Sequence, residues 1–408
     1  MKTAQKQGWR RSQLVYCSNV HPGASLAEVR SVIEHQIASV RKLRGLNRMG
    51  TGLWLSAQAA EELCSDAQTM ADFSQLLHTN ELDLFALNGF PFDDFHIDRV
   101  KERVYQPNWA TPERLTYTQN LARILAACLP ANEPFGSIST LPLGYATNWT
   151  EDEHTQALTT LCQLVKSLAE LKIETGRHIR VCLEMEPGCV LESTEQTISF
   201  FTDHLATAAP QHGLSKELIF NHLGICFDIC HQAVMFEEPA QSLARFKEAG
   251  ITIGKIQISS ALELKQPADC NPETVLSDFA EPRYFHQVRS RNQDGILTGK
   301  MDLPDLFIEK SFPRNNPWRI HFHVPIQLAT TTESTLGTTQ DAILRLLDYM
   351  QRHPDFHPHL EVETYTWQVL PPTLRPSTDA DLHKGLLDEL SWLEKSMHSL
   401  NLLQDLPQ

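Results

Sequence analysis

The stretch Gly224-Ile225-Cys226-Phe227-Asp228-Ile229-Cys230-His231 joins a short apolar run to a carboxylate and, three residues later, an imidazole. The run 223–227 is apolar and partly β-branched, which predicts a buried strand. Asp228 then lies at the C-terminal edge of this strand, where parallel α/β proteins build their ligand sites. An anionic oxygen beside a neutral nitrogen suits a divalent metal. The alternative is that Asp228 caps the next helix and His231 is a polar residue at the rim.

Seven more short apolar runs alternate with longer amphipathic segments. They cover residues 14–18, 52–55, 83–88, 136–141, 179–184, 253–258 and 359–363. Between them lie helical patterns, one opened by the capping box of Thr150 and Glu153, one over 237–249 and one after Thr339. Eight strands that alternate with helices predict an α/β protein whose parallel sheet closes into a (β/α)8 TIM barrel.

Three parts of the chain depart from this alternation. Residues 1–13 are polar and basic and are expected to be disordered. Residues 14–376 are expected to form one barrel domain. Residues 377–408 are expected to form an amphipathic helix that packs on the barrel. Residues 260–326 are too long for a strand–helix loop, and Asn292-Gln293-Asp294-Gly295 is typical of a hairpin turn. We therefore predict a hairpin or lid inserted after the seventh strand, with 318–326 returning to the barrel mouth as a ninth strand.

Composition excludes several classes of function. The formal net charge of −15 over 408 residues disfavours nucleic acid as a partner, because binding it requires a basic surface. The chain contains no apolar stretch of 18 residues, so no membrane-spanning helix is expected. Nine cysteines without a C-x-x-C pair indicate a reduced, cytoplasmic protein. Nucleotide-binding motifs are missing, so no nucleotide cofactor is indicated.

Two predicted strands end in paired glutamates. Glu184 and Glu186 share one face of the fifth strand. A carboxylate that faces a barrel interior is costly unless a cation neutralises it. We favour Glu184 as a site residue and expect Glu186 to be an exposed loop residue before the Pro-Gly turn. On the eighth strand, Glu363 is nearer the edge and is the better ligand, whereas Glu361 is a candidate for a buried ion pair lower down.

Other polar residues near strand ends are weaker candidates. Gln257 on the seventh strand is a possible carbonyl ligand, a partner for a substrate hydroxyl, or a residue with a structural hydrogen bond. His321 and His323 share one face of an extended segment, a spacing found both in metal sites and on exposed strand edges. His286 is a weaker candidate still. Asn88 is placed to orient a polar ligand, although the turn formed by Asn88 and Gly89 also accounts for it.

Three of these stretches resemble the ligand-bearing strand ends of the xylose isomerase-like TIM barrels, a superfamily of sugar isomerases, keto-sugar epimerases and nucleases of the endonuclease IV type. The stretches are Cys182-Leu183-Glu184, Phe227-Asp228-Ile229-Cys230-His231 and Val362-Glu363-Thr364. The resemblance implies that Glu184, Asp228 and Glu363 bind a divalent ion (Mn, Mg or Zn). It implies that His231 binds the metal or the substrate. The superfamily usually has a histidine where this chain has Gln257, a place that His321 or His323 could fill.

A longer set of motifs resembles the EboE family, described as metabolite-traffic proteins of a bacterial and algal gene cluster. The motifs cover residues 18–23, 87–91, 136–140, 183–188, 255–260, 321–325 and 361–367. This resemblance implies a role in making or moving a small-molecule precursor, with other products of the cluster as possible partners.

Together these patterns predict a metal-dependent isomerase or epimerase acting on a small sugar-like or polyol metabolite. Glu184 or Glu363 would move the proton, and the substrate would be held by the remaining polar residues: Gln257, His321, His323, Asn88 and His286. One alternative is a non-catalytic carrier on the same scaffold. A phosphodiesterase or abasic-site nuclease is the other alternative, and the acidic net charge argues against it.

Overall fold

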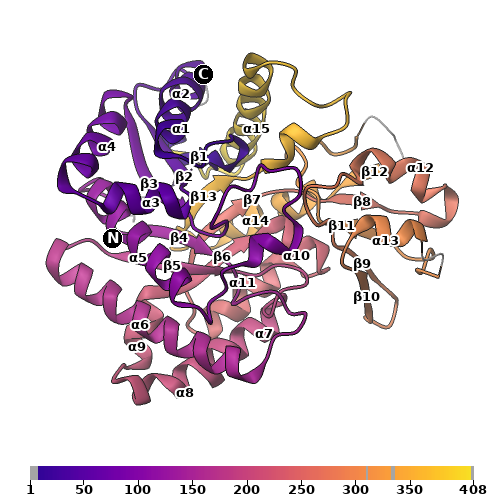
Figure 1. The fold of residues 1–408 in the computed structure, drawn as a ribbon. Coiled ribbons are helices and arrows are strands. Elements are labelled where there is room, and N and C mark those ends of the chain that lie inside the picture. The colour runs from indigo at the N-terminus through magenta and orange to yellow at the C-terminus, as the bar shows by residue number, and fades with distance from the viewer. Residues whose placement is uncertain (1–7, 309–310, 332–335, 406–408) are drawn as a thin grey trace, which may run out of the picture.

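The computed structural model describes residues 8–308, 311–331 and 336–405, and a barrel of eight parallel strands forms its centre (Figure 1). The strands are β1 (Leu14–Tyr16), β2 (Met49–Trp54), β3 (Leu82–Asn88), β4 (Gly136–Thr140), β5 (Ile179–Glu184), β6 (Leu223–Asp228), β7 (Ile253–Ile258) and β13 (His359–Val362). They pair in the order β1-β13-β7-β6-β5-β4-β3-β2, and a parallel bridge between Cys17 and Gly52 closes the ring. The predicted (β/α)8 barrel is confirmed, and each of the eight strands falls on one of the short apolar runs.

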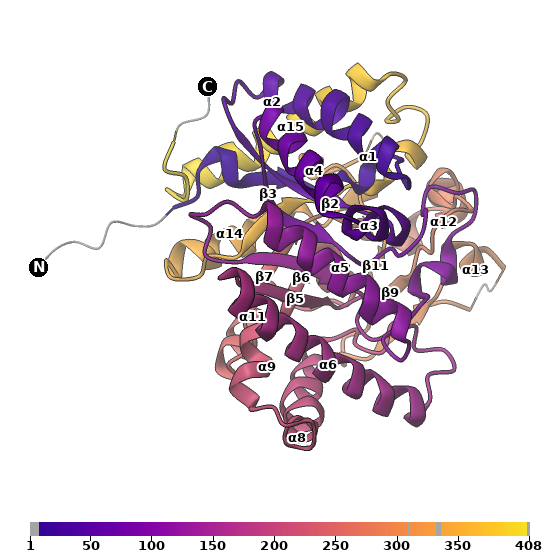
Figure 2. The ribbon, with the colours of Figure 1, turned by 60° about the vertical axis from the view of Figure 1, so that its left-hand side comes forward.

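Helices surround the barrel (Figures 1 and 2). They are α1 (Leu26–Ser31), α2 (Ala38–Leu43), α3 (Ala57–Cys64), α4 (Ala67–Thr79), α5 (Pro112–Cys128), α6 (Glu151–Thr175), α7 (Thr194–Ser199), α8 (Ala206–Ala208), α9 (Lys216–His222), α10 (Ile229–Val234), α11 (Pro239–Glu248), α14 (Gln340–Arg352) and α15 (Asp379–Ser399). At the start of α6, Thr150 and Glu153 form the predicted capping box. No described helix is long and apolar enough to cross a bilayer.

The barrel interior holds one buried ion pair. All residues of β6 and β7 are buried, as expected for strands covered on both faces. Lys255 Nζ lies 3.0 Å from Glu361 Oε1, and both side chains are fully buried. The ion pair proposed for Glu361 is therefore present, and it leaves Glu363 as the carboxylate at the C-terminal end of this strand.

The part of the sequence between β7 and α14 forms a second sheet, which is antiparallel. This sheet lies beside the barrel together with α12 (Pro272–Leu276) and α13 (Leu303–Ile308) (Figure 1). Its strands are β8 (Leu262–Leu264), β9 (Val288–Arg291), β10 (Leu297–Lys300), β11 (Trp318–Ile320) and β12 (Leu336–Thr338), in the order β10-β9-β11-β8-β12. The expected turn at 292–295 does join two strands as a hairpin, β9 and β10.

The predicted ninth barrel strand over 318–326 is wrong. Only Trp318–Ile320 forms a strand, and it pairs with β8 and β9 in the second sheet. The barrel is already closed, so it offers no free edge for another strand. His321 and His323 consequently lie on a non-regular segment just beyond β11.

The first and last described segments pack on each other. Residues 1–7 and 406–408 lie outside the described part. Residues 8–13 differ from the expected disorder: Trp9 is buried, stacks on His357, and donates its backbone N–H to Leu402 O at 2.8 Å. The tail forms α15, which packs against α2 and β1.

Candidate functional site

A cavity with about 70 Å³ of internal space opens at the C-terminal end of the barrel strands. Its polar floor is lined by Asn19, Asn88, Glu184, Glu186, His231, His321 and Glu363. Its walls come from the loop after β3, from the inserted segment before β9 and from the segment after β13.

Three carboxylates from three strands meet at this floor. Glu184 and Asp228 are the last residues of β5 and β6, and Glu363 directly follows β13. One oxygen of each lies within 4.8 Å of an oxygen of the other two. Their side chains are at most 4% exposed. The buried ammonium group of Lys255 pairs with Glu361 and only partly offsets the charges of Glu184 and Glu363, whose pKa values stay raised.

Their crowding changes how the three groups ionise. Burial raises the pKa of Glu184 to about 7, and repulsion from Asp228 adds to the effect. Burial also raises the pKa of Glu363 well above its usual range, reinforced by the other two carboxylates. Burial alone would raise the pKa of Asp228, but His231 and His323 outweigh it and hold the pKa below its ordinary value. A bound cation would allow all three carboxylates to be charged together.

Several buried atoms near this point have no hydrogen-bond partner within the described residues. They are Glu184 Oε2, Asp228 Oδ2, His323 Nε2 and both amide atoms of Gln257. Such atoms are rare in folded proteins unless water or an ion satisfies them.

The other carboxylate oxygen of Asp228, Oδ1, already has two hydrogen-bond donors. It accepts hydrogen bonds from the hydroxyl of Ser259 and from the backbone N–H of His231, each at 2.9 Å. Asp228 therefore caps helix α10, as the alternative interpretation of the sequence proposed, and still directs Oδ2 towards the cluster. His323 Nε2 lies 4.0 Å from this Oδ2. Carboxylate oxygens and an imidazole nitrogen form a donor set that fits Mn²⁺ or Zn²⁺.

Three histidine rings lie beside the carboxylates. The Nδ1 atoms of His231, His321 and His323 lie 2.6–2.8 Å from oxygens that only accept, namely Met185 O, Gln287 Oε1 and Glu363 O. Each ring therefore carries a proton on Nδ1. The Nε2 atoms of His231 and His321 are 3.1 Å apart, so a hydrogen bond between them requires a second proton on one of the two rings.

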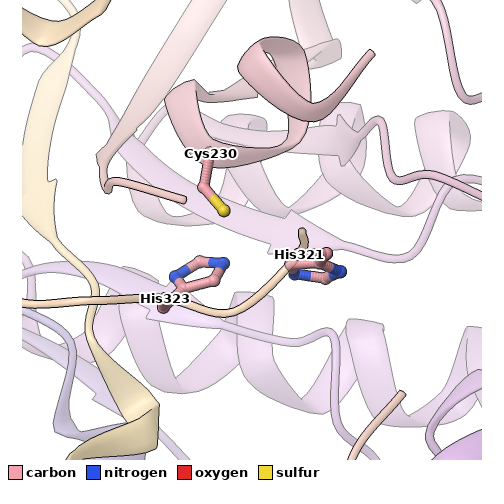
Figure 3. Close-up of side chains that lie close together, drawn as sticks. All are labelled: Cys230, His321 and His323. Carbon is pink, nitrogen blue, oxygen red and sulfur yellow. The ribbon is translucent and has the colours of Figure 1, made fainter. Parts of the chain in front are cut away.

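Figure 3 shows the thiol of Cys230 directed towards the space between the rings of His321 and His323. Ligand atoms of these three residues lie within 4.8 Å of one another. Burial lowers the pKa of His323 to about 4 and that of His321 well below the ordinary value. Burial has the same tendency at His231, but the nearby carboxylates outweigh it and raise the pKa of that ring.

The structure brings most of the sequence-predicted site residues to one place. Glu184, His231, His321, Glu363 and Asn88 line the cavity. Asp228, Gln257 and His323 are fully buried and do not line it. His286 does not line the cavity either, because its Nδ1 bonds His321 O at 3.0 Å and its Nε2 lies 2.8 Å from Glu281 Oε1.

Glu186 is a residue whose environment the sequence did not reveal. It was expected to be an exposed loop residue, yet it is 6% exposed and lines the cavity. The hydroxyl of Tyr105 donates to its Oε1 at 2.7 Å, and Gln287 Nε2 donates at 3.2 Å. Both partners come from distant loops, so no local pattern points to this environment.

Asn19 was also missed. Its Nδ2 donates to Glu363 Oε1 at 2.8 Å, and Asn88 donates to the same oxygen at 3.1 Å. Its position just after the first strand was the signal available, since polar residues at these strand ends form the site.

Comparisons with known proteins give likeness of fold only. No protein-family profile and no curated protein matches the chain. Among solved structures, a D-tagatose 3-epimerase-like protein is similar over 95% of this chain and 99% of its own, with 13% identity and a TM-score of 0.47. D-allulose 3-epimerase from Methylomonas sp. covers 95% and 98%, with 9% identity and a TM-score of 0.49. The 3-keto-D-glucoside 4-epimerase of E. coli covers 94% and 99%, with 11% identity and a TM-score of 0.44. The barrel assignment rests on the strand pairing itself, and none of these comparisons tests the EboE resemblance.

Proposed function

We propose that the protein is a divalent-metal-dependent enzyme of the isomerase or epimerase type, acting on a small sugar-like or polyol metabolite. The supporting observation is the meeting of three buried carboxylates from β5, β6 and the end of β13, with oxygens within 4.8 Å of one another. Without a cation, burial and mutual repulsion raise the pKa of Glu184 to about 7 and that of Glu363 well above its ordinary value, so the arrangement opposes full ionisation of the three groups.

Glu184, Asp228 and Glu363 would hold the ion, with His323 Nε2 as a fourth donor. The unpartnered Glu184 Oε2, Asp228 Oδ2 and His323 Nε2 support this choice. In this assignment His323 supplies the imidazole that the superfamily usually has on the seventh strand, where this chain has Gln257. When bound, the ion would polarise a substrate carbonyl or a pair of hydroxyls.

The remaining steps fall to side chains of the cavity floor. Asn19 and Asn88 fix one oxygen of Glu363, whereas Glu184 lines the cavity with an oxygen that has no partner. We assign Glu184 to take a proton from the carbon beside the substrate carbonyl and, after exchange with solvent, to return a proton to the adjacent carbon of the enediol; Glu363 is the alternative shuttle. The imidazoles of His231 and His321 would form hydrogen bonds with substrate hydroxyls.

A non-catalytic carrier is the second candidate. Gln257, an amide at the strand-seven position, favours it because amides are weak metal ligands. In either case, the EboE resemblance suggests a cytoplasmic role in metabolite traffic with other products of the same gene cluster. A phosphodiesterase is third, and the net charge of −15 argues against it.

Metal analysis followed by an exchange assay tests the proposal. We expect about one divalent ion per chain in protein purified without chelators, and its loss in Asp228→Asn but not in the exposed control Asp348→Asn. In D₂O, ketoses should gain deuterium next to the carbonyl in a metal-dependent reaction that Glu184→Gln abolishes. A metal-free protein that binds ketoses without exchange would instead be a carrier.

A further inference from the structure

One side of the cavity is lined by mainly apolar side chains, five of them without a polar atom and two of them tyrosines. The residues that form it are Phe90, Phe95, Val100, Val104, Tyr284, Phe285 and Tyr365, here called the apolar wall. They come from the loop after β3, from the inserted segment before β9 and from the segment after β13. Three separate parts of the chain thus converge to present apolar surface to the same cavity whose floor carries the carboxylates.

The apolar wall is already packed into a defined shape. The ring of Phe95 lies 5.5 Å from that of Trp54, 5.7 Å from Tyr284 and 5.9 Å from Tyr365. The rings of Tyr284 and Tyr365 are 5.0 Å apart. These separations are those of favourable aromatic pairs, so the wall does not need to rearrange to receive a ligand.

Most polar groups beside the apolar wall already have partners. The ammonium group of Lys101 pairs with Asp302, and the hydroxyl of Tyr105 donates to Glu186. The buried hydroxyl of Tyr284 has no partner among the described residues. A hydroxyl group placed against the side chains of the wall that lack polar atoms, such as Phe90, Phe95 and Val100, would lose its bonds to water and gain none in return, which is unfavourable. The floor differs, because Glu184 Oε2 is an acceptor without a protein donor. The cavity therefore suits a molecule with one hydroxylated end and one apolar end.

We propose that the substrate carries an apolar substituent, an alkyl or aryl group of several carbons, on the hydroxylated head that the floor binds. The assignment of a hydroxylated head depends on the proposed function, whereas the assignment of an apolar substituent depends on the apolar wall alone. A free sugar would contact the wall with hydroxyls, and a substituted polyol would contact it with carbon.

Displacement of an apolar dye tests this inference without turnover. N-phenyl-1-naphthylamine should bind the cavity and gain fluorescence, and n-alkyl β-D-glucosides below their micelle concentrations should displace it. Each added methylene should tighten binding about fourfold until the wall is covered, from about 0.8 kcal/mol per buried methylene. Glucose itself should not displace the dye.

Val104→Asn places an amide at the half-buried rim of the wall and should weaken dye binding at least tenfold. Leu344→Asn is the matched control, because Leu344 is an exposed apolar residue on α14. The inference is overturned if the dye does not bind, if displacement ignores chain length, or if Val104→Asn binds like the wild type.

Metal content measured on the same samples separates the two proposals. Bound metal without chain-length dependence overturns the apolar substituent and leaves the metal enzyme in place. Chain-length dependence without metal supports the substituent and contradicts the metal enzyme.

Discussion

Replacing Glu184 by Gln should change how the stability of the metal-free protein depends on pH. The pKa of this buried carboxyl is about 7 in the folded chain, against an ordinary value of 4.5. Because the folded value is the higher one, the group's contribution to stability is full below pH 4.5 and is lost as pH rises through 7. At 1.36 kcal/mol per pH unit, the loss is about 3 kcal/mol.

This loss has a measurable thermal signature. With an unfolding entropy of about 2.1 cal/mol/K per residue, 3 kcal/mol in a chain of this length lowers the Tm by about 3–4 °C. In chelator, the Tm of the wild-type protein should fall between pH 5 and pH 8 by about 3–4 °C more than the Tm of Glu184→Gln does. Thermal unfolding monitored by circular dichroism at both pH values provides the measurement.

The control is Glu174→Gln, the same change at an exposed position on α6, which should follow the wild type at both pH values. Added Mn²⁺ at pH 8 should raise the Tm of the wild type and of Glu174→Gln, but not that of Glu184→Gln. Parallel pH profiles for the wild type and Glu184→Gln in chelator would refute the reasoning.

Two further substitutions test the neighbourhood of the cluster. His323→Ala should weaken metal binding more than tenfold, measured by competition with a chromogenic chelator, while the exposed His398→Ala leaves affinity unchanged; equal affinities would remove His323 from the ligand set. Lys255→Met should destabilise the barrel by about 3–5 kcal/mol in urea unfolding because it leaves a buried charge on Glu361. Adding Glu361→Leu should recover most of that loss, and no recovery would show that the loss comes from packing.

The barrel was predictable because its strands are buried on both faces. Strands that are covered on both faces consist of consecutive apolar residues, which are visible in the sequence as short apolar runs. The eight runs coincide with the eight barrel strands. The meeting of Glu184, Asp228 and Glu363 was predictable for a related reason. Residues at the C-terminal edge of parallel barrel strands lie close together at the barrel mouth, where ligand sites are built.

What the sequence did not reveal depends on contacts between distant segments. Glu186 is buried because Tyr105 and Gln287 bond to it, and neither residue is near it along the chain. β8 and β12 of the second sheet were missed because each is only three residues long, too short for an alternating pattern to be visible, and β11 was predicted as part of a longer strand of the barrel. His286 was expected at the substrate, yet its contact with Glu281 depends on the fold of the inserted segment.

The most direct test of the central claim is a crystal structure of the protein with Mn²⁺, examined for anomalous scattering. We predict a strong peak about 2.0–2.3 Å from oxygens of Glu184, Asp228 and Glu363 and from His323 Nε2. The claim would be contradicted by carboxylates that hydrogen-bond one another through shared protons with no peak between them, or by a peak only at another place.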